Sequence, residues 1–241
     1  FSLMSFCDGE TLKHMPAVQD HKRAYEGDTG PNTGGMGTYS NADHSLPFLT
    51  NEDIAEAQAI NMATAKALKN KFGEGYKGVL YGGFMATADG VKLIEYNARF
   101  GDPEAMNVLP LLDADFIEIC NSIADGTLNS VDVKFQNKAT VCKYAVPEGY
   151  PDKPVKDKPI DISNVVNTDN LFYASVDIQN GQLVEAGSRT VAVVGIANTI
   201  SEAEKIAENE ISAVEGPLFH RTDIGSMQLI NKRVEHMDSL R

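Results

Sequence analysis

The chain has 241 residues, of which 42 % are hydrophobic and 23 % charged, as expected of a soluble globular protein with one large domain or two modest ones. Its 21 basic and 34 acidic residues give a net charge of −13, which argues against nucleic acid or an anionic membrane as a partner, and no apolar run approaches the ~18 residues of a membrane span. Its three cysteines, Cys7, Cys120 and Cys142, are widely spaced, so we expect buried free thiols in a reducing, cytoplasmic compartment.

The first elements of the chain are predicted to form a β-hairpin. Residues 1–6 alternate apolar and polar, Asp8-Gly9 signals a turn, and residues 11–18 can return as the second strand. The chain opens directly on a strand at Phe1. We therefore expect it to be a fragment of a longer protein.

A mixed-charge segment and a glycine-rich loop follow the hairpin. Alternation along an extended chain predicts that Asp20 and Lys22 lie on one side, and His21 and Arg23 on the other. The loop at 28–37 contains four glycines, so its backbone can approach a ligand closely and adopt positive φ angles. It matches neither the P-loop nor the dinucleotide-binding pattern, and such a loop by itself is more often only a turn.

The next stretch is predicted to form a capped helix and a second hairpin. Thr50-Asn-Glu-Asp53 resembles a capping box, and Gly73 is a typical helix end. Strands over 78–85 and 91–97 then pair around a turn at 88–90. This arrangement would serve as scaffold for the polar residues at the end of the second strand.

The end of that strand carries the strongest chemical signal in the chain. Alternation places Glu95, Asn97 and Arg99 on one face, with Ile94 and Tyr96 on the other. A carboxylate and an amide oxygen two residues apart suit Mg²⁺, and the planar fork of arginine suits a phosphoryl or acyl phosphate group. A solvated strand end is the simpler interpretation of Glu-x-Asn alone, but the Arg-Phe-Gly-Asp-Pro-Glu sequence that follows favours a functional site.

Near residues 129–137 the predicted structure changes from helices to short β-strands. Before this boundary, Asp113 is predicted to cap a helix that ends at Gly126. After it, Asn180-Gly181 signals a tight hairpin and Thr199 is predicted to cap a helix. The predicted β runs cover 139–146, 171–178, 182–185 and 190–196. We expect two domains, residues 1–132 and residues 133–241.

Two motifs carry a resemblance to a known family. One is Arg99-Phe-Gly-Asp-Pro-Glu-Ala-Met106, and the other joins Gln19-Asp-His-Lys-Arg23 to the loop from Asp28 to Gly37. In sequence, order and spacing they resemble phosphoribosylamine–glycine ligase (glycinamide ribonucleotide synthetase), a family of ATP-grasp enzymes of purine biosynthesis. The resemblance runs through the whole chain. It implies an α+β chain in which an ATP-grasp C-terminal lobe, an antiparallel sheet with flanking helices, precedes a small mixed β/α domain.

The resemblance also implies a reaction. The complete enzyme would join glycine to 5-phosphoribosylamine at the expense of ATP, through glycyl phosphate, with Mg²⁺ or Mn²⁺ as the metal. Such phosphoryl transfer depends on positioning and charge neutralisation. In the family the start of this chain falls just after the residues that contact adenine. The chain alone is therefore expected to be incomplete and to need the N-terminal half of the enzyme.

The resemblance assigns roles to individual residues. Glu95 and Asn97 are expected to hold the metal, Arg99 to stabilise the acyl phosphate, and Asp102 to hold the ammonium of glycine. Further substrate contacts are expected from Asp20, Lys22, Arg23, Asp28, Asn32 and Glu104. The neighbouring strand at 80–84 offers no additional acidic ligand, so phosphate oxygens and water, or an unidentified carboxylate, would complete the metal shell.

Three alternatives stay open. The complete enzyme can be another ATP-grasp carboxylate–amine ligase with different substrates, which a substrate panel would distinguish. The chain can be a folded half that catalyses nothing alone. A regulatory nucleotide-binding module is the least favoured of the three.

Overall fold

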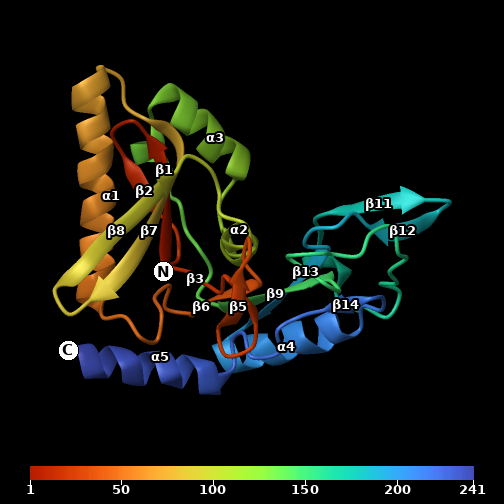
Figure 1. The fold of residues 1–241 in the computed structure, drawn as a ribbon. Helices are drawn as coiled ribbons and strands as arrows, with labels where there is room; N and C mark the ends of the chain where they lie inside the picture. The colour runs from red at the N-terminus through yellow and green to blue at the C-terminus, as the bar shows by residue number, and fades with distance from the viewer.

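The structure is a computed structural model that describes all 241 residues, and it consists of a tall lobe with an arm that projects from its base (Figure 1). In the lobe, helix α1 (Asn51–Phe72) lies on one side of a four-stranded sheet, and helix α3 (Phe116–Asp125) lies on the other side. Helices α4 (Ile200–Ser212) and α5 (Met227–Leu240) run along the base. No helix combines the length and the apolar character needed to cross a membrane.

The sheet of the lobe is antiparallel throughout, with strand order β2-β1-β7-β8. Its strands are β1 (Ser2–Asp8), β2 (Leu12–His14), β7 (Lys77–Thr87) and β8 (Gly90–Asn97). Both predicted hairpins are therefore confirmed. Every residue of β1 is buried, because α1 and α3 cover this central strand from both faces.

The helices of the lobe follow their local capping signals. Helix α1 (Asn51–Phe72) has the predicted capping box at Thr50 and ends at Gly73 with φ 80°. Helix α3 (Phe116–Asp125) is capped by Asp115, so the prediction of Asp113 as its cap was wrong. A capping side chain must lie immediately before the first turn to reach its free N–H groups, and Asp113 lies two residues too early. A short helix, α2 (Glu104–Val108), follows the Arg-Phe-Gly-Asp-Pro motif.

The pairing of β7 with β8 shifts by one residue at Ile94, which forms a β-bulge. Because the bulge interrupts the alternation of side chains, Ile94 lines the same cavity as Glu95, and the prediction that it lies on the opposite face was wrong. Tyr96 does lie on the other face. Its hydroxyl forms hydrogen bonds of 3.0 Å with the side chains of Asn61 and Thr64 on α1.

The second large sheet joins the lobe to the arm, with strand order β10-β13-β9-β6-β3. Its strands are β3 (Gln19–Asp20), β6 (Gly37–Ser40), β9 (Ala139–Pro147), β10 (Leu171–Tyr173) and β13 (Val191–Ala197), with β14 (Leu218–Phe219) paired to β9. Residues 19–20 thus pair with β6 in this sheet, after the end of the first hairpin. The sheet takes strands from both sides of residue 132, and the domain boundary there stays a prediction.

The outer part of the chain adds a hairpin and two helices. The predicted β run at 171–178 is split between β10 and β11 (Val176–Gln179), and β11 pairs with β12 (Gln182–Glu185) across Asn180-Gly181, as predicted. Helix α4 (Ile200–Ser212) is capped by Thr199, also as predicted, and packs on β9 and β13. Helix α5 (Met227–Leu240) was not predicted.

The core consists of two clusters, and the larger one takes residues from both sheets. The larger cluster has 28 buried hydrophobic residues, and the smaller has 9, among them Phe6 of β1, Tyr81 of β7 and Ile119 of α3. Cys7 and Cys142 are buried free thiols, as predicted. Cys120 is free but exposed, because it lies on the solvent side of α3, so the prediction of a third buried thiol was wrong.

Candidate active site

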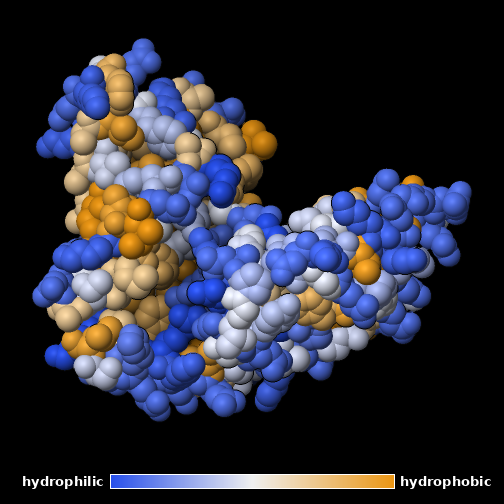
Figure 2. All heavy atoms as spheres, viewed as in Figure 1, coloured by the Kyte–Doolittle hydropathy of each residue, from blue (hydrophilic) through white to orange (hydrophobic).

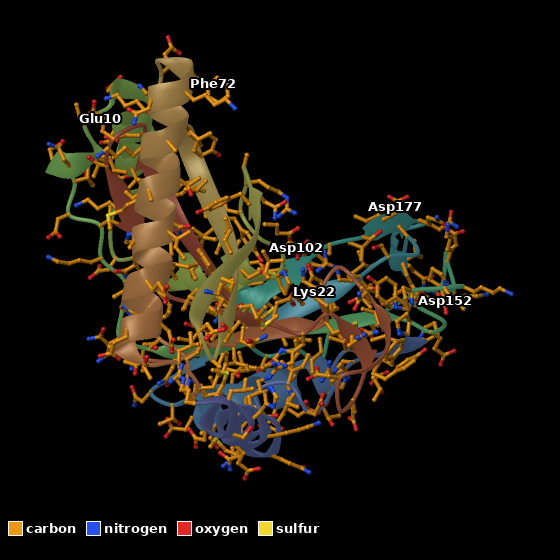
Figure 3. The ribbon with its side chains drawn as sticks, turned by 60° about the vertical axis from the view of Figure 1, so that its left-hand side comes forward. Glu10, Lys22, Phe72, Asp102, Asp152 and Asp177 are labelled. Carbon is orange, nitrogen blue, oxygen red and sulfur yellow. The ribbon has the colours of Figure 1, made fainter.

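A cavity of about 480 Å³ opens where the lobe meets β3 and the glycine-rich segment. Its lining includes these predicted site residues: Asp20, Lys22, Arg23, Asp28, Asn32 and Glu95. Lys22 and Asp102 lie in the middle of the molecule, between the lobe and the arm, in Figure 3. The exposed side chains of Met85 and Ile94 form an apolar side of the cavity, and Figure 2 shows apolar atoms on this part of the lobe.

The segment after β3 brings opposite charges into the same cavity. The strand ends at Asp20, and a new strand, β4 (Arg23–Tyr25), begins three residues later and pairs with β5 (Thr29–Asn32). Because the chain bends between these strands, Asp20, Lys22 and Arg23 all line the cavity with His21. The predicted separation into two opposite sides was therefore wrong.

His21 is almost fully buried and is held neutral. Its Nδ1 lies 3.3 Å from the carbonyl oxygen of Gly37. Burial, followed by the nearby Arg233 guanidinium, lowers the pKa of His21 to about 3. The cationic lining of the cavity is therefore supplied by lysine and arginine.

Asp28 is already engaged in ion pairs on both of its oxygens. Its Oδ1 accepts a hydrogen bond from Arg221 and its Oδ2 accepts one from Arg233, each at 3.0 Å. The backbone of Asp28 has φ 59°, a left-handed conformation that aspartate tolerates better than most residues. Arg233 belongs to the unpredicted helix α5 and lines the cavity, so the C-terminal segment contributes directly to the site.

Asp20 and Glu104 form an acidic pair beside the cavity. Burial, followed by the charge of Glu104, raises the pKa of Asp20 to about 7, against the opposing effect of Lys22. Glu104 is 3 % exposed and accepts a 2.7 Å hydrogen bond from the hydroxyl of Tyr81, which lines the cavity. Two carboxyl groups in such surroundings are suited to binding an ammonium group.

Of the two predicted metal ligands on strand β8, Glu95 lines the cavity and Asn97 does not. Nδ2 of Asn97 lies 3.5 Å from Oε1 of Glu95, so these two side chains share a face as predicted. The strand ends at Asn97, and the NH1 group of Arg99 donates to the carbonyl oxygen of Phe100 at 2.8 Å. Arg99 therefore lies beyond the end of the strand, so the alternation of side chains along the strand does not determine its direction. It is not among the residues that line the cavity.

The donor set around Glu95 fits a hard cation that retains other ligands. Gly83 lies opposite Glu95 on β7 and has no side chain. A Cβ added to Gly83 would lie 3.5 Å from its nearest neighbour, Cγ of Glu95, so the space beside this carboxylate is open. The chain has no group of three His, Cys, Asp or Glu side chains arranged for a metal. One carboxylate and one amide oxygen therefore suit Mg²⁺ if phosphate oxygens and water complete its shell.

Asp102 lies outside the cavity lining, at the junction with the C-terminal part of the chain. Its Oδ1 accepts a hydrogen bond from the hydroxyl of Tyr144, and its Oδ2 accepts one from Arg189, both at 2.8 Å. Its expected contact with the ammonium of glycine stays a prediction. Nothing in the sequence singled out Arg189 or Tyr144, because both lie far from Asp102 along the chain.

Comparison with known families places both motifs in one group of proteins. Residues 1–105 match the model of the phosphoribosylglycinamide synthetase ATP-grasp (A) domain, and residues 140–227 match that of the C domain of the same synthetase. The chain belongs to the phosphoribosylglycinamide synthetase family. This membership confirms the resemblance and the expected fold class, and ATP-grasp enzymes generally use ATP and divalent metal ions.

Curated relatives carry the same family name. Phosphoribosylamine–glycine ligases of Methanocaldococcus jannaschii and Methanosarcina acetivorans are each 55 % identical to the chain over its full length. The match covers 55 % of the first relative and 54 % of the second. The chain thus spans about half the length of the synthetases that it matches.

Solved structures show the same fold. The phosphoribosylamine–glycine ligase of Thermotoga maritima is 30 % identical and superposes with a TM-score of 0.81, over 92 % of this chain and 55 % of that one. The biotin carboxylase domain of the Hydrogenobacter thermophilus 2-oxoglutarate carboxylase, at 13 % identity, has a TM-score of 0.63 over 98 % of this chain and 48 % of that one. The second likeness concerns the fold alone.

Proposed function

We propose that this chain is the C-terminal part of a phosphoribosylamine–glycine ligase. The complete enzyme would join glycine to 5-phosphoribosylamine and release ADP and phosphate, in de novo purine biosynthesis. The observation that carries this proposal is that residues of the 19–37 segment and Glu95 line the same cavity. Close relatives named for this reaction support the choice of substrates.

The residues of the cavity and its rim have the chemistry that the reaction needs. Glu95 and Asn97 would hold Mg²⁺ or Mn²⁺, which supplies charge neutralisation for the phosphates when bound. Arg99 would stabilise the acyl phosphate of glycine from the rim of the site. Lys22 and Arg23 would bind the anionic groups of the substrates, with Asn32 as a neutral hydrogen-bonding partner beside them.

The acidic residues would receive the amines. Asp20 and Glu104 offer the environment that favours an ammonium or a neutral amine donating hydrogen bonds. Asp102 would act on the ammonium of glycine, and this role competes with its bonds to Arg189 and Tyr144. Asp28 would organise the site through Arg221 and Arg233.

The proposal includes a partner segment. Because the chain spans about half of its relatives, the N-terminal half of the synthetase would supply the remaining nucleotide contacts. A cytoplasmic location agrees with the three free cysteines. The competing proposal, supported by the same coverage, is that the chain alone is inactive. Calorimetric titration with Mg²⁺·ATP, before and after addition of the N-terminal half, distinguishes the two.

The metal assignment can be tested in a fusion of this chain to the N-terminal part of the Methanocaldococcus jannaschii relative, which is 55 % identical over the shared part. We call this fusion the completed protein. Glu95→Ala should abolish metal-dependent ADP release, whereas Glu118→Ala, on the exposed surface of α3, should leave it unchanged. Unchanged metal-dependent turnover in Glu95→Ala would refute the assignment of Glu95 as a metal ligand.

A further inference from the structure

Arg189 stands between β12 and β13, in the C-terminal part of the chain, yet its guanidinium bonds only to segments of the N-terminal part. Its NH1 group lies 3.1 Å from the carbonyl oxygen of Gly34, 3.2 Å from that of Gly35 and 3.1 Å from that of Asp102. Its NH2 group donates to Oδ2 of Asp102 at 2.8 Å. One side chain thus joins the glycine-rich loop to the turn that precedes α2.

The surroundings of Arg189 distinguish it from an ordinary surface ion pair. Its side chain is only 15 % exposed, and its guanidinium carbon lies 4.6 Å from the centre of the Tyr144 ring. The hydroxyl of Tyr144 donates to the other oxygen of Asp102, so the stacked pair holds both carboxylate oxygens. A planar fork of donors is required for this geometry, and lysine cannot reproduce it.

The two segments that Arg189 joins meet at the acidic pair. A Cβ on Gly35 would lie 2.8 Å from Oδ1 of Asp20 and 2.7 Å from Cδ of Pro103. The loop is therefore packed directly between Asp20 and the turn that leads into Glu104. Any separation of the loop from the turn would move the two carboxyl groups relative to each other.

We propose that Arg189 is a positioning residue, which fastens the glycine-rich loop to the Asp102 turn and thereby sets the geometry of Asp20 and Glu104 at the cavity. Its effect on catalysis rests on the function proposed above. Its effect on the loop does not, because it concerns only contacts within this chain. The C-terminal part of the chain would in this way complete a substrate site most of whose lining residues lie in the N-terminal part.

The first test measures amide hydrogen exchange in the 241-residue chain. Arg189→Met should speed exchange at Gly35 and Met36, and in the first turn of α2, by about tenfold, because charged hydrogen bonds that close both segments are lost. Exchange in β9 should change much less. Lys138→Met is the matched control, since it removes a cation that bonds only to Asn198 on the surface.

The second test uses the completed protein and separates positioning from general destabilisation. Arg189→Met should raise the KM for glycine or for phosphoribosylamine by about tenfold and leave the KM for ATP within about twofold. Arg189→Lys keeps the charge and should give a smaller change in the same direction. If Arg189→Met does not fold, the exchange pattern of Arg189→Lys decides the question.

Three results bear differently on the two proposals. Loop and turn amides that exchange at the wild-type rate in both variants would overturn the role of Arg189. Uniformly faster exchange across all elements, with unchanged KM values, would reduce Arg189 to a contributor to stability and would also overturn it. A wild-type completed protein without glycine-dependent ADP release would refute the proposed function, while the exchange experiment would still decide the role of Arg189.

Discussion

The hydroxyl of Tyr81 donates a 2.7 Å hydrogen bond to Oε1 of Glu104, and this bond joins strand β7 of the lobe to helix α2. Glu104 is 3 % exposed, so few other donors can reach it. Tyr81→Phe should therefore lower the free energy of unfolding by about 1–3 kcal/mol, the cost of an unpaired buried acceptor. Urea denaturation of the chain measures this change.

A matched tyrosine provides the control for that experiment. Tyr173 is 56 % exposed and its hydroxyl has no hydrogen-bond partner in the protein. Tyr173→Phe should change the free energy of unfolding by less than about 0.5 kcal/mol. Equal effects of the two substitutions would show that the bond to Glu104 contributes nothing to stability.

The pKa of Asp20 predicts how stability depends on pH. This pKa is raised from 3.8 to about 7 in the folded chain. Between pH 4 and 7 the unfolded chain therefore releases a proton that the folded chain keeps, so this group makes the free energy of unfolding fall as pH rises. Asp20→Asn should reduce the fall, and Asp152→Asn, an exposed control, should not. A pH profile of stability identical in wild type and Asp20→Asn would contradict the raised pKa.

Arg221 is 1 % exposed and depends on two carboxylates of unequal importance. Asp223 receives two hydrogen bonds from it, from Nε and from NH2, each at 2.8 Å, whereas Asp28 receives one. Asp223→Asn should therefore destabilise the chain by about 3 kcal/mol or more. Asp28→Asn should cost about 1–2 kcal/mol, because its second ion pair, with Arg233, is partly exposed and therefore weak. The reverse order in thermal or urea unfolding would refute this account of the network.

The amide of Asn97 provides a test of the metal site that does not depend on turnover. In the completed protein with ADP present, Asn97→Ala should weaken Mn²⁺ binding, followed by electron paramagnetic resonance, by at least about tenfold. Asn97→Asp retains an oxygen donor at the same position and should preserve binding. Equal Mn²⁺ affinity in wild type and Asn97→Ala would exclude this residue from the metal shell.

Local signals in the sequence predicted the scaffold well. The capping box at Thr50, the helix end at Gly73 and the tight turn at Asn180-Gly181 depend on neighbouring residues, and all three were confirmed. The bulge at Ile94 was missed because it depends on the pairing of β8 with β7. Alternation rules cannot reveal a shift of register that the partner strand imposes.

The site was predictable where a motif is contiguous and not where distant segments meet. Glu95 was found from its place at the end of a predicted strand and the 19–32 residues from a short motif, and they do share a cavity. Arg189, Arg233 and Tyr144 were missed, because each lies in the C-terminal part of the chain and acquires its role only through tertiary contacts. Single-sequence patterns contain no signal for such contacts.

The most direct test of the central claim is the substrate dependence of ADP release by the completed protein. We predict release only when glycine and 5-phosphoribosylamine are both present with Mg²⁺·ATP, and formation of glycinamide ribonucleotide in equal amount. Release that proceeds without phosphoribosylamine, or that accepts another carboxylate in place of glycine equally well, would contradict the assignment of this chain to a phosphoribosylamine–glycine ligase.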